Sequence, residues 1–309
     1  MASGSFKVDF FCVGVAKAGT TTLHDLLSLQ DNISLPKRKE TNYFSFGIFG
    51  KPAFTGPLDN SSVNEPTVIS FDEYVGDFEH QAGCLYGEIC PSYFLDGAAA
   101  NIYEHNPDAK IIILLREPVG RTYSNYQHLV RDGREHENFE AALAAESSRL
   151  SQGWEWFWGL KRNSLYYDSV KTYVDLFGKE NVQILFFENF VNDQAQHVKA
   201  VMDFIGLDPA TAKHEEFNSN KSGVVSGKWR FLHRILLSEG FLNTTLRIII
   251  PTPLRKKLGL LFKSLSTVKG DVSTETKKHL SHEYSSDLIQ LNELIGGEVS
   301  HWLGERSVS

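Results

Sequence analysis

The sequence predicts an α/β fold: one domain in which a parallel sheet of four or five strands carries helices on both faces. Three apolar runs predict the central strands, at residues 10–15, 110–115 and 182–187. Continuous apolar runs are typical of parallel strands that are covered on both sides. Because ligand sites in open sheets of this kind lie at the carboxyl ends of the strands, the residues after each run are the first candidates for a site.

Two shorter strands and a series of helices complete the predicted fold. Residues 32–35 and 84–89 suit short strands. Residues 45–81 are polar and weakly periodic, so we expect an acceptor-side loop or lid there, with a short helix near 71–78. Helical spacing predicts the remaining helices at residues 119–132, 137–150, 165–177, 194–205 and 274–295.

Length and composition limit the organisation of the chain. It has 309 residues, of which 41% are hydrophobic, enough for one large α/β domain or two small ones. We expect one domain over residues 1–309, with residues 1–6 disordered or foreign to the natural chain. No apolar run approaches the length of a membrane-spanning helix, and the first residues lack the pattern of a signal peptide. Three cysteines cannot all pair, which favours reduced thiols and a cytoplasmic location.

Charge is unevenly distributed along the chain. The net charge is −7, which argues against a nucleic-acid-binding protein. Residues 226–269 nevertheless contain nine Lys or Arg and one acid, a net +8, so the rest of the chain carries −15. This segment is either a solvated face or a surface for an anionic partner.

The stretch that follows the first strand is a candidate anion site. Gly14-Val-Ala-Lys17-Ala18-Gly19-Thr20-Thr21-Thr22 joins the predicted strand to a predicted helix. Backbone N–H groups and the helix dipole would point at one spot, while Lys17 adds a charge and the threonines add hydroxyl groups. The stretch is not a Walker A motif, in which the lysine follows the second glycine, since Lys17 precedes Gly19. An ordinary strand-to-helix turn with a lone lysine is the alternative.

A second motif follows the strand at 110–115. That strand ends in Arg116-Glu-Pro, and Ser124 lies about two helical turns further on. A nucleoside triphosphatase would need an aspartate at such a strand end to hold Mg²⁺. Arg116 offers instead a planar fork for a phosphate group, which Ser124 could share.

The two motifs together, K-x-G-T-T-T and R-x₇-S, resemble the sulfotransferases that use 3′-phosphoadenosine 5′-phosphosulfate (PAPS). The resemblance implies that Lys17 and residues 18–22 bind the 5′-phosphosulfate, and that Arg116 and Ser124 bind the 3′-phosphate. It implies release of adenosine 3′,5′-bisphosphate and no metal. It runs through nearly the whole chain and implies that the predicted parallel sheet has a P-loop-like fold.

The same resemblance implies a general base in the run Lys37-Arg-Lys39-Glu40-Thr-Asn42-Tyr-Phe. Glycan sulfotransferases carry K-E-x-H-[FY]-F at this place, and their glutamate takes the proton of the acceptor hydroxyl. Glu40 matches that glutamate, while Asn42 replaces the frequent histidine. The alternative is that Glu40 pairs with the neighbouring basic residues.

Further site residues follow from the later motifs. His128 lies four residues after Ser124 on the predicted helix and could serve as a second acid or base, or could be a structural histidine. Phe187, at a strand end that resembles the family's [FY]-E-D, is a candidate contact for adenine. Lys221 could close over the 3′-phosphate within the basic segment 217–269, with Lys228 and Arg230 as rivals.

The acceptor is predicted less directly. Ile89 stands where family members that act on glycans often have a lysine, which argues against a typical glycan acceptor. Trp154, Trp156 and Trp158 suit either the wall of an apolar pocket or the core. A hydroxyacyl chain on an acidic carrier protein docked at residues 226–269, another small hydroxyl compound, and a carbohydrate hydroxyl are the candidate acceptors. A P-loop small-molecule kinase and a non-catalytic nucleotide-binding protein are the alternatives from other classes.

Overall fold

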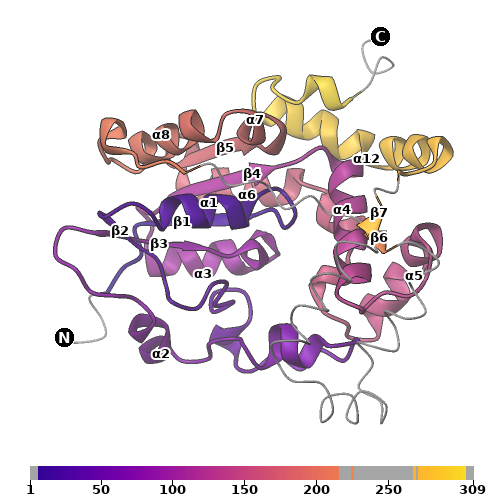
Figure 1. Ribbon diagram of the computed structural model, residues 1–309, viewed down its shortest axis with the longest axis horizontal. Helices are drawn as coiled ribbons and strands as arrows, with labels where there is room; N and C mark the ends of the chain where they lie inside the picture. Colours follow the sequence, from indigo (N-terminus) through magenta and orange to yellow (C-terminus); the bar gives the residue numbers. More distant parts are fainter. Residues whose placement is uncertain (1–5, 216–223, 226–266, 269–270, 304–309) are drawn as a thin grey trace.

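A central parallel sheet organises the computed structural model, which describes residues 6–215, 224–225, 267–268 and 271–303. Its five strands lie in the order β2-β3-β1-β4-β5 (Figure 1). All four neighbouring pairs are parallel, which confirms the predicted sheet. The strands are β1 Phe10–Gly14, β2 Ile33–Ser34, β3 Leu85–Ile89, β4 Lys110–Leu115 and β5 Val182–Phe186.

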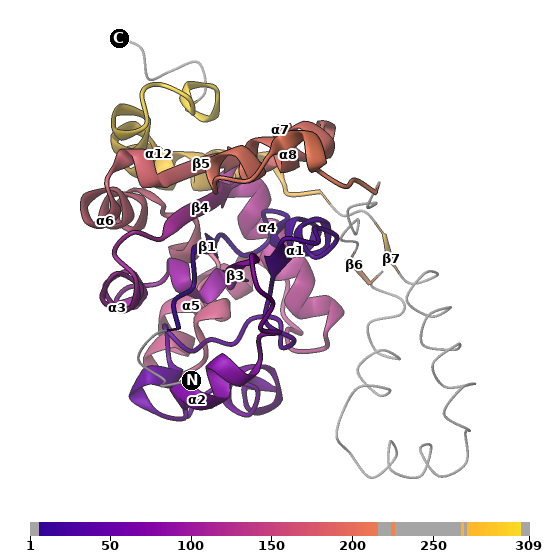
Figure 2. The same ribbon diagram turned by 90° about the vertical axis from the view of Figure 1, so that its left-hand side faces the viewer.

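Helices cover both faces of this sheet, as Figure 2 shows. Helices α1 (Thr20–Leu27) and α8 (Gln194–Phe204) lie against one face. Helices α3 (Ala98–His105) and α6 (Tyr167–Phe177) lie against the other. The described C-terminal helix α12 (Thr274–Leu294) packs on α6 and on α4, so it also joins the body of the fold.

The remaining elements lie mostly around the ends of the strands. The longer ones are α2 Phe71–Gly76, α4 Pro118–Arg131, α5 Phe139–Ser151 and α7 Phe187–Asn192. Residues Asn60–Asn64 form one π-helical turn, and Val224–Val225 (β6) pairs antiparallel with Thr267–Val268 (β7). Short 3₁₀ turns are found at Gly47–Phe49, Pro91–Phe94, Trp156–Trp158, Arg162–Ser164, Lys179–Asn181, Pro209–Thr211 and Ser300–Trp302.

The core explains why the strands were recognisable in the sequence. Every residue of β1 is buried, and residues 111–115 of β4 are fully buried. Close packing leaves no room for a side chain at Gly87 of β3, which lies opposite Phe10 of β1. A Cβ atom at Gly87 would lie 2.0 Å from the Phe10 ring, so this glycine lets the aromatic ring cover the neighbouring strand.

The predicted elements agree with the structure apart from their ends and two helices that were not predicted, α3 and α7. Strand β1 stops at Gly14 rather than Val15, and Phe187 begins α7 instead of ending β5. Helix α3 was not predicted, because its short run Ala-Ala-Ala-Asn-Ile-Tyr-Glu-His shows little apolar spacing.

Several sequence predictions concern residues outside the described part of the chain. Lys221, Lys228 and Arg230 are among them, as is nearly all of the basic segment 226–269. Within the described residues, no helix has the length and apolarity that a bilayer crossing requires. The three cysteines are free thiols.

Candidate functional site

The loop between β1 and α1 has the backbone of an anion cradle. It turns through two residues with positive φ, Lys17 (74°) and Gly19 (94°), before α1 begins at Thr20. Gly19 caps α1 without a side-chain hydrogen bond, so the first N–H groups of the helix keep their hydrogen-bonding capacity. A Cβ atom at Gly19 would lie 3.2 Å from the Phe187 ring, so a glycine is favoured here by both φ and space.

Two arginines hold the carbonyl groups of this loop. Arg116, directly after β4, donates from Nη1 to the Lys17 carbonyl oxygen at 2.9 Å. Arg121, on α4, donates from Nε to the Ala16 carbonyl oxygen at 3.1 Å. Since both carbonyl oxygens face guanidinium groups, the loop can present N–H groups to an anion without opposing carbonyl dipoles.

The Lys17 side chain meets His128. Its Nζ lies 3.1 Å from His128 Nδ1, and His128 Nε2 lies 3.0 Å from an Asp132 carboxylate oxygen. Arg131 Nη2 lies 2.6 Å from the same Nδ1. Because cationic donors face Nδ1 and a carboxylate faces Nε2, we assign the proton of the neutral ring to Nε2. The structure thus brings together two residues that the sequence analysis named separately, a contact that was not predicted.

Burial sets the protonation of this group. Desolvation, with Arg131 as the next cause, lowers the pKa of Lys17 to about 8. Desolvation also lowers the pKa of His128, although its hydrogen bond to Asp132 acts in the opposite direction. Near neutral pH the site therefore holds a charged lysine beside a neutral histidine.

The predicted phosphate pair comes from the end of β4 and from α4. Arg116 stacks on Phe187, with its guanidinium carbon 4.4 Å from the ring centroid. Ser124 is buried on α4, the helix that also carries Arg121 and His128. Helix α4 starts at Pro118 because the Glu117 carboxylate accepts from two N–H groups of its first turn.

The predicted base reaches the cradle through a lysine. Lys39 Nζ donates to Thr21 Oγ1 at 2.7 Å and lies 3.7 Å from a Glu40 carboxylate oxygen. Glu40 and Asn42 both have positive φ, 60° and 55°. A strained backbone at two nearby non-glycine residues requires support from the surrounding structure.

Glu88, at the end of β3, supplies that support and was not predicted as a functional residue. It is fully buried, and one carboxylate oxygen accepts from Thr41 N at 3.2 Å and Thr41 Oγ1 at 2.6 Å. The other accepts from the Tyr74 and Tyr93 hydroxyl groups at 2.8 and 2.9 Å. Desolvation raises the pKa of Glu88, while these hydrogen bonds oppose the rise. The residue beside Glu40 is thereby fixed to the sheet.

Asn42 and Ile89, the two residues that differ from the pattern of glycan sulfotransferases, both contact the protein's own interior. Asn42 accepts through Oδ1 from Ser92 Oγ at 2.7 Å, which ties the Glu40 loop to the segment after β3. Ile89 is buried in the core. Neither position places a charge at the cradle.

The tryptophans divide between a cavity and the core. Trp158 is buried and donates from its indole N–H to Asp59 at 3.1 Å. Trp156 lines a cavity of about 170 Å³ beside the first residues of the cradle. The cavity mixes apolar and polar walls, formed by Val15, Ala16, Pro91, Phe94, Leu95, Asp96, Trp156, Arg162, Asn163, Leu165, Asp168 and Ser169.

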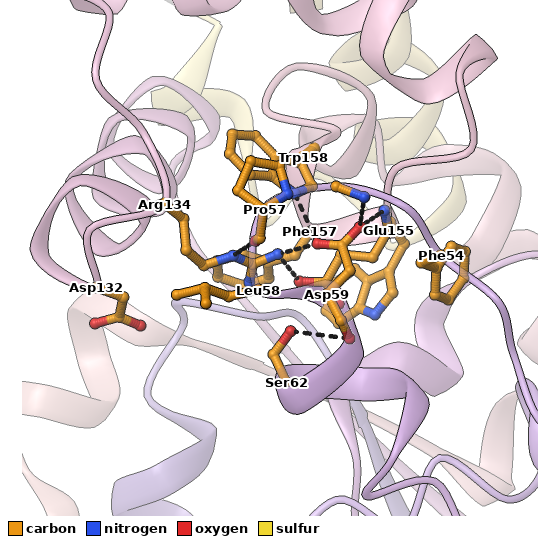
Figure 3. A network of polar contacts seen from close by, with 12 residues as sticks. Phe54, Pro57, Leu58, Asp59, Ser62, Asp132, Arg134, Glu155, Phe157 and Trp158 are labelled. Atoms are coloured by element: carbon orange, nitrogen blue, oxygen red, sulfur yellow. Dashed lines mark hydrogen bonds and ion pairs between the residues drawn. The ribbon is translucent and has the colours of Figure 1, made fainter. Parts of the chain in front are cut away.

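The tip of the 45–81 segment is held by a buried ionic network (Figure 3). Arg134, after α4, lies 2.5 Å from both Asp59 and Glu155 and donates from Nε to the Pro57 carbonyl. The backbone N–H groups of Gly56 and Glu155 each donate to Asp59 at 2.8 Å. Burial raises the pKa of Glu155 to about 7, which Arg134 opposes. These contacts fix the tip of the 45–81 segment to the residues between α4 and α5 and to Glu155 after α5.

The comparisons with known proteins decide the family. A profile described as a sulfotransferase domain matches residues 99–235, a stretch that includes Arg116 and Ser124. The crystal structure of a sulfotransferase from Alicyclobacillus acidocaldarius shares 30% sequence identity, covers 96% of this chain and 99% of its own, and has a TM-score of 0.73. The chain belongs to the sulfotransferase family.

Curated sulfotransferases are similar over part of their length. Mouse carbohydrate sulfotransferase 15 is 21% identical over 252 residues, which cover 67% of this chain and 45% of that protein. Mouse heparan sulfate glucosamine 3-O-sulfotransferase 6 is 31% identical over 141 residues, 45% of this chain and 40% of that protein. This sulfotransferase chain therefore spans less than half the length of these relatives.

Sequence reasoning missed the residues that act behind the site. Arg121 contacts Ala16 beside Lys17, Glu88 contacts Thr41 beside Glu40, and Asp132 contacts His128. Asp132 could have been found from its i,i+4 spacing to His128. Among the described residues, no cluster of three or more His, Cys, Asp or Glu side chains could hold a metal ion.

Proposed function

We propose that this sulfotransferase moves a sulfuryl group from PAPS to an acceptor hydroxyl. One observation carries the proposal: the residues matched to phosphosulfate, 3′-phosphate and base all meet one loop. Lys17 belongs to that loop, Arg116 holds its backbone, and Lys39 links Glu40 to Thr21. Three separate sequence motifs thus meet at the β1–α1 loop and the first turn of α1.

The residues present fit the nucleotide. The open N-terminus of α1, the cationic Lys17 and the hydroxyl groups of residues 20–22 suit the 5′-phosphosulfate. Arg116 uses one nitrogen for the loop, and its remaining N–H groups, together with the Ser124 hydroxyl, are the proposed donors to the 3′-phosphate. Phe187, already under the Arg116 guanidinium, is the proposed aromatic contact for adenine, and Lys221 is a proposed further contact for the 3′-phosphate.

Each group has a defined task in the proposed reaction. PAPS, when bound, supplies the sulfuryl group. Glu40 accepts the proton of the acceptor hydroxyl as that oxygen forms its new bond to sulfur. Lys17 and the loop N–H groups stabilise the negative charge that grows on the departing 5′-phosphate. His128, neutral and held by Asp132, keeps Lys17 in place and is the second proposed acid or base.

Two sets of observations favour two different classes of acceptor. The names of the curated relatives point to carbohydrates, and Trp156, Asp96, Arg162 and Asn163 around the cavity are side chains that stack on and hydrogen-bond sugars. The buried Ile89 and the net charge of +8 at residues 226–269 instead favour a hydroxyacyl chain on an acidic carrier protein. Sulfation of each acceptor class in parallel distinguishes them.

A thermal-shift titration tests the cofactor. Adenosine 3′,5′-bisphosphate and ADP are compared with EDTA present, at concentrations up to about 100 times the dissociation constant, where binding adds about 2.7 kcal/mol. We expect stabilisation by the 3′-phosphorylated nucleotide alone, and its loss in Arg116→Ala. Equal stabilisation by ADP, or stabilisation that requires Mg²⁺, would favour a kinase. Binding without any turnover that depends on Glu40 would favour a non-catalytic nucleotide-binding protein.

A further inference from the structure

Arg121 is a buried cation whose acceptors are all neutral. It is fully buried on α4 and donates to the Ala16 carbonyl at 3.1 Å. It also donates to the Leu160 carbonyl at 3.0 Å, to Ser164 Oγ at 2.9 Å and to Asn125 Oδ1 at 2.6 Å. Within the described part of the chain it forms no ion pair. A guanidinium keeps its charge even where burial lowers its pKa, as burial does here.

Arg134 shows how this fold treats another buried arginine. Its side chain is 6% exposed, and it pairs with both Asp59 and Glu155. Burying an unpaired charge is costly, so buried arginines are normally compensated in this way. Arg121 has no such carboxylate partner among the described residues, and it lies against the backbone of the loop that carries Lys17.

We propose that Arg121 is a positioning residue for the 5′-phosphosulfate group of the nucleotide. It fixes the cradle through the Ala16 carbonyl, and its charge strengthens anion binding in the loop without touching the anion. Glu146 attracts this charge from nearby, but within the described residues no carboxylate forms an ion pair with it. The inference rests on the proposed function, because it assumes that the loop holds the 5′ end of a 3′-phosphorylated nucleotide.

Two physical consequences follow from this arrangement. A buried charge acts through a medium of low dielectric constant, so its attraction for an anion survives salt that screens surface charges. The same charge acts on Lys17, whose pKa is lowered by desolvation first, then by Arg131 and Arg116, and also by Arg121. Removing the Arg121 charge should therefore weaken binding of the anion and raise the pKa of Lys17.

The test compares two nucleotides that differ only at the 5′ position. Calorimetric titrations of the wild type and Arg121→Gln with adenosine 3′,5′-bisphosphate and with adenosine 3′-monophosphate are made at pH 7 and pH 9. We expect Arg121→Gln to lose about tenfold in affinity for the bisphosphate and markedly less for the monophosphate. We also expect its affinity to fall less between pH 7 and pH 9, because Lys17 stays protonated to higher pH.

A second pair of variants keeps the arginine in place, in case Arg121→Gln does not fold. Asn125→Asp sets a carboxylate against Arg121 Nη2 and compensates the charge. Asn125→Ala removes the hydrogen bonds of the same side chain to Arg121 and to the Phe157 carbonyl without adding charge. We expect Asn125→Asp to show the selective loss for the bisphosphate and Asn125→Ala to keep the wild-type ratio of the two affinities.

The outcomes separate this inference from the proposed function. Equal losses for both nucleotides with an unchanged pH dependence would show a packing role alone and overturn the inference. Wild-type selectivity retained in both Arg121→Gln and Asn125→Asp would overturn it as well. A wild type that binds neither nucleotide would overturn the proposed function, and this inference with it.

Discussion

The cradle loop after β1 and the Glu40 loop after β2 are each held in place by a buried charged side chain, and the two side chains have opposite charges. Both loops contain non-glycine residues with positive φ, and both are held by a buried charged side chain from a neighbouring element. Arg121 holds the Ala16 carbonyl of the cradle, whereas Glu88 holds the N–H and hydroxyl groups of Thr41. A cation binds carbonyl groups and leaves N–H groups for an anion. An anion binds N–H groups and leaves the adjacent carboxylate of Glu40 to the acceptor side.

The comparison indicates that the two loops have separate functions, which variants of single residues can test. The cradle should govern nucleotide binding, and the Glu40 loop should govern the chemical step. Each variant below is expected to move one of these quantities and leave the other nearly unchanged.

The largest effect is expected from Glu40→Gln. Loss of a general base lowers the rate by about 10²–10⁴-fold. Affinity for adenosine 3′,5′-bisphosphate should stay near the wild-type value, because among the described residues Lys39 is what links Glu40 to the cradle. Steady-state kinetics and calorimetry measure the two quantities. Glu104→Gln, an exposed residue on α3, is the matched control, and a rate of Glu40→Gln equal to that control would exclude Glu40 as the base.

The next effect is expected from Arg116→Ala on the cradle side. Hydrogen bonds to charged groups contribute about 1.5–3 kcal/mol, so the dissociation constant for the bisphosphate should rise by roughly 10–100-fold. The change also frees the Lys17 carbonyl, so part of the loss comes from the loop itself. Titration with adenosine 5′-monophosphate, which lacks the 3′-phosphate, is the control ligand. An equal loss of affinity for both ligands would show that Arg116 does not bind the 3′-phosphate.

Glu155→Gln tests the pH dependence of the network that anchors the acceptor-side segment. The pKa of Glu155 is raised to about 7 in the folded protein, above the value of 4.5 for a free glutamate. Its contribution to stability is therefore complete below pH 4.5 and is lost as pH rises through 7, on the order of 3 kcal/mol in total. The wild type should lose several degrees of Tm between pH 5 and pH 8 relative to Glu155→Gln. Parallel Tm curves for the two proteins would contradict this.

A smaller effect is expected from Glu88→Gln. An amide oxygen can still accept from one set of donors, but its NH₂ group faces the others, which costs about 1–3 kcal/mol of stability. The turnover rate should fall because Thr41 no longer fixes the Glu40 loop, while affinity for the bisphosphate should change little. The two are measured on the same preparation. A loss of nucleotide affinity as large as the loss of rate would show that Glu88 supports the whole sheet edge instead.

The two regions also differ in how far the sequence could reveal them. The cradle, Arg116 and Ser124 are contiguous motifs at the ends of strongly apolar strands, so pattern alone located them. The contact between Lys17 and His128 was not predicted, although both residues were candidates, because no local pattern relates residues 111 positions apart. The support of the Glu40 loop depends on Glu88, Tyr74 and Tyr93, which are far from Glu40 in sequence or lie within polar, weakly periodic segments.

Long-range packing accounts for what sequence could not predict. The strand order β2-β3-β1-β4-β5 depends on which crossovers pack together, and no local pattern encodes it. Arg121 looks like an ordinary basic position on an amphipathic helix until the fold buries it under the cradle. Trp156 and Trp158 share one motif, yet one lines the cavity and the other fills the core.

The most direct test that the two loops have separate functions is one binding experiment on three proteins. Adenosine 3′,5′-bisphosphate is titrated by calorimetry at pH 7 into the wild type, Lys17→Met and Glu40→Gln. The account predicts that Glu40→Gln binds as the wild type does and that Lys17→Met loses at least about tenfold in affinity, because a charged hydrogen bond at the anion is removed. Similar binding by Lys17→Met and the wild type, or a comparable loss in Glu40→Gln, would contradict the central claim that the two loops act separately.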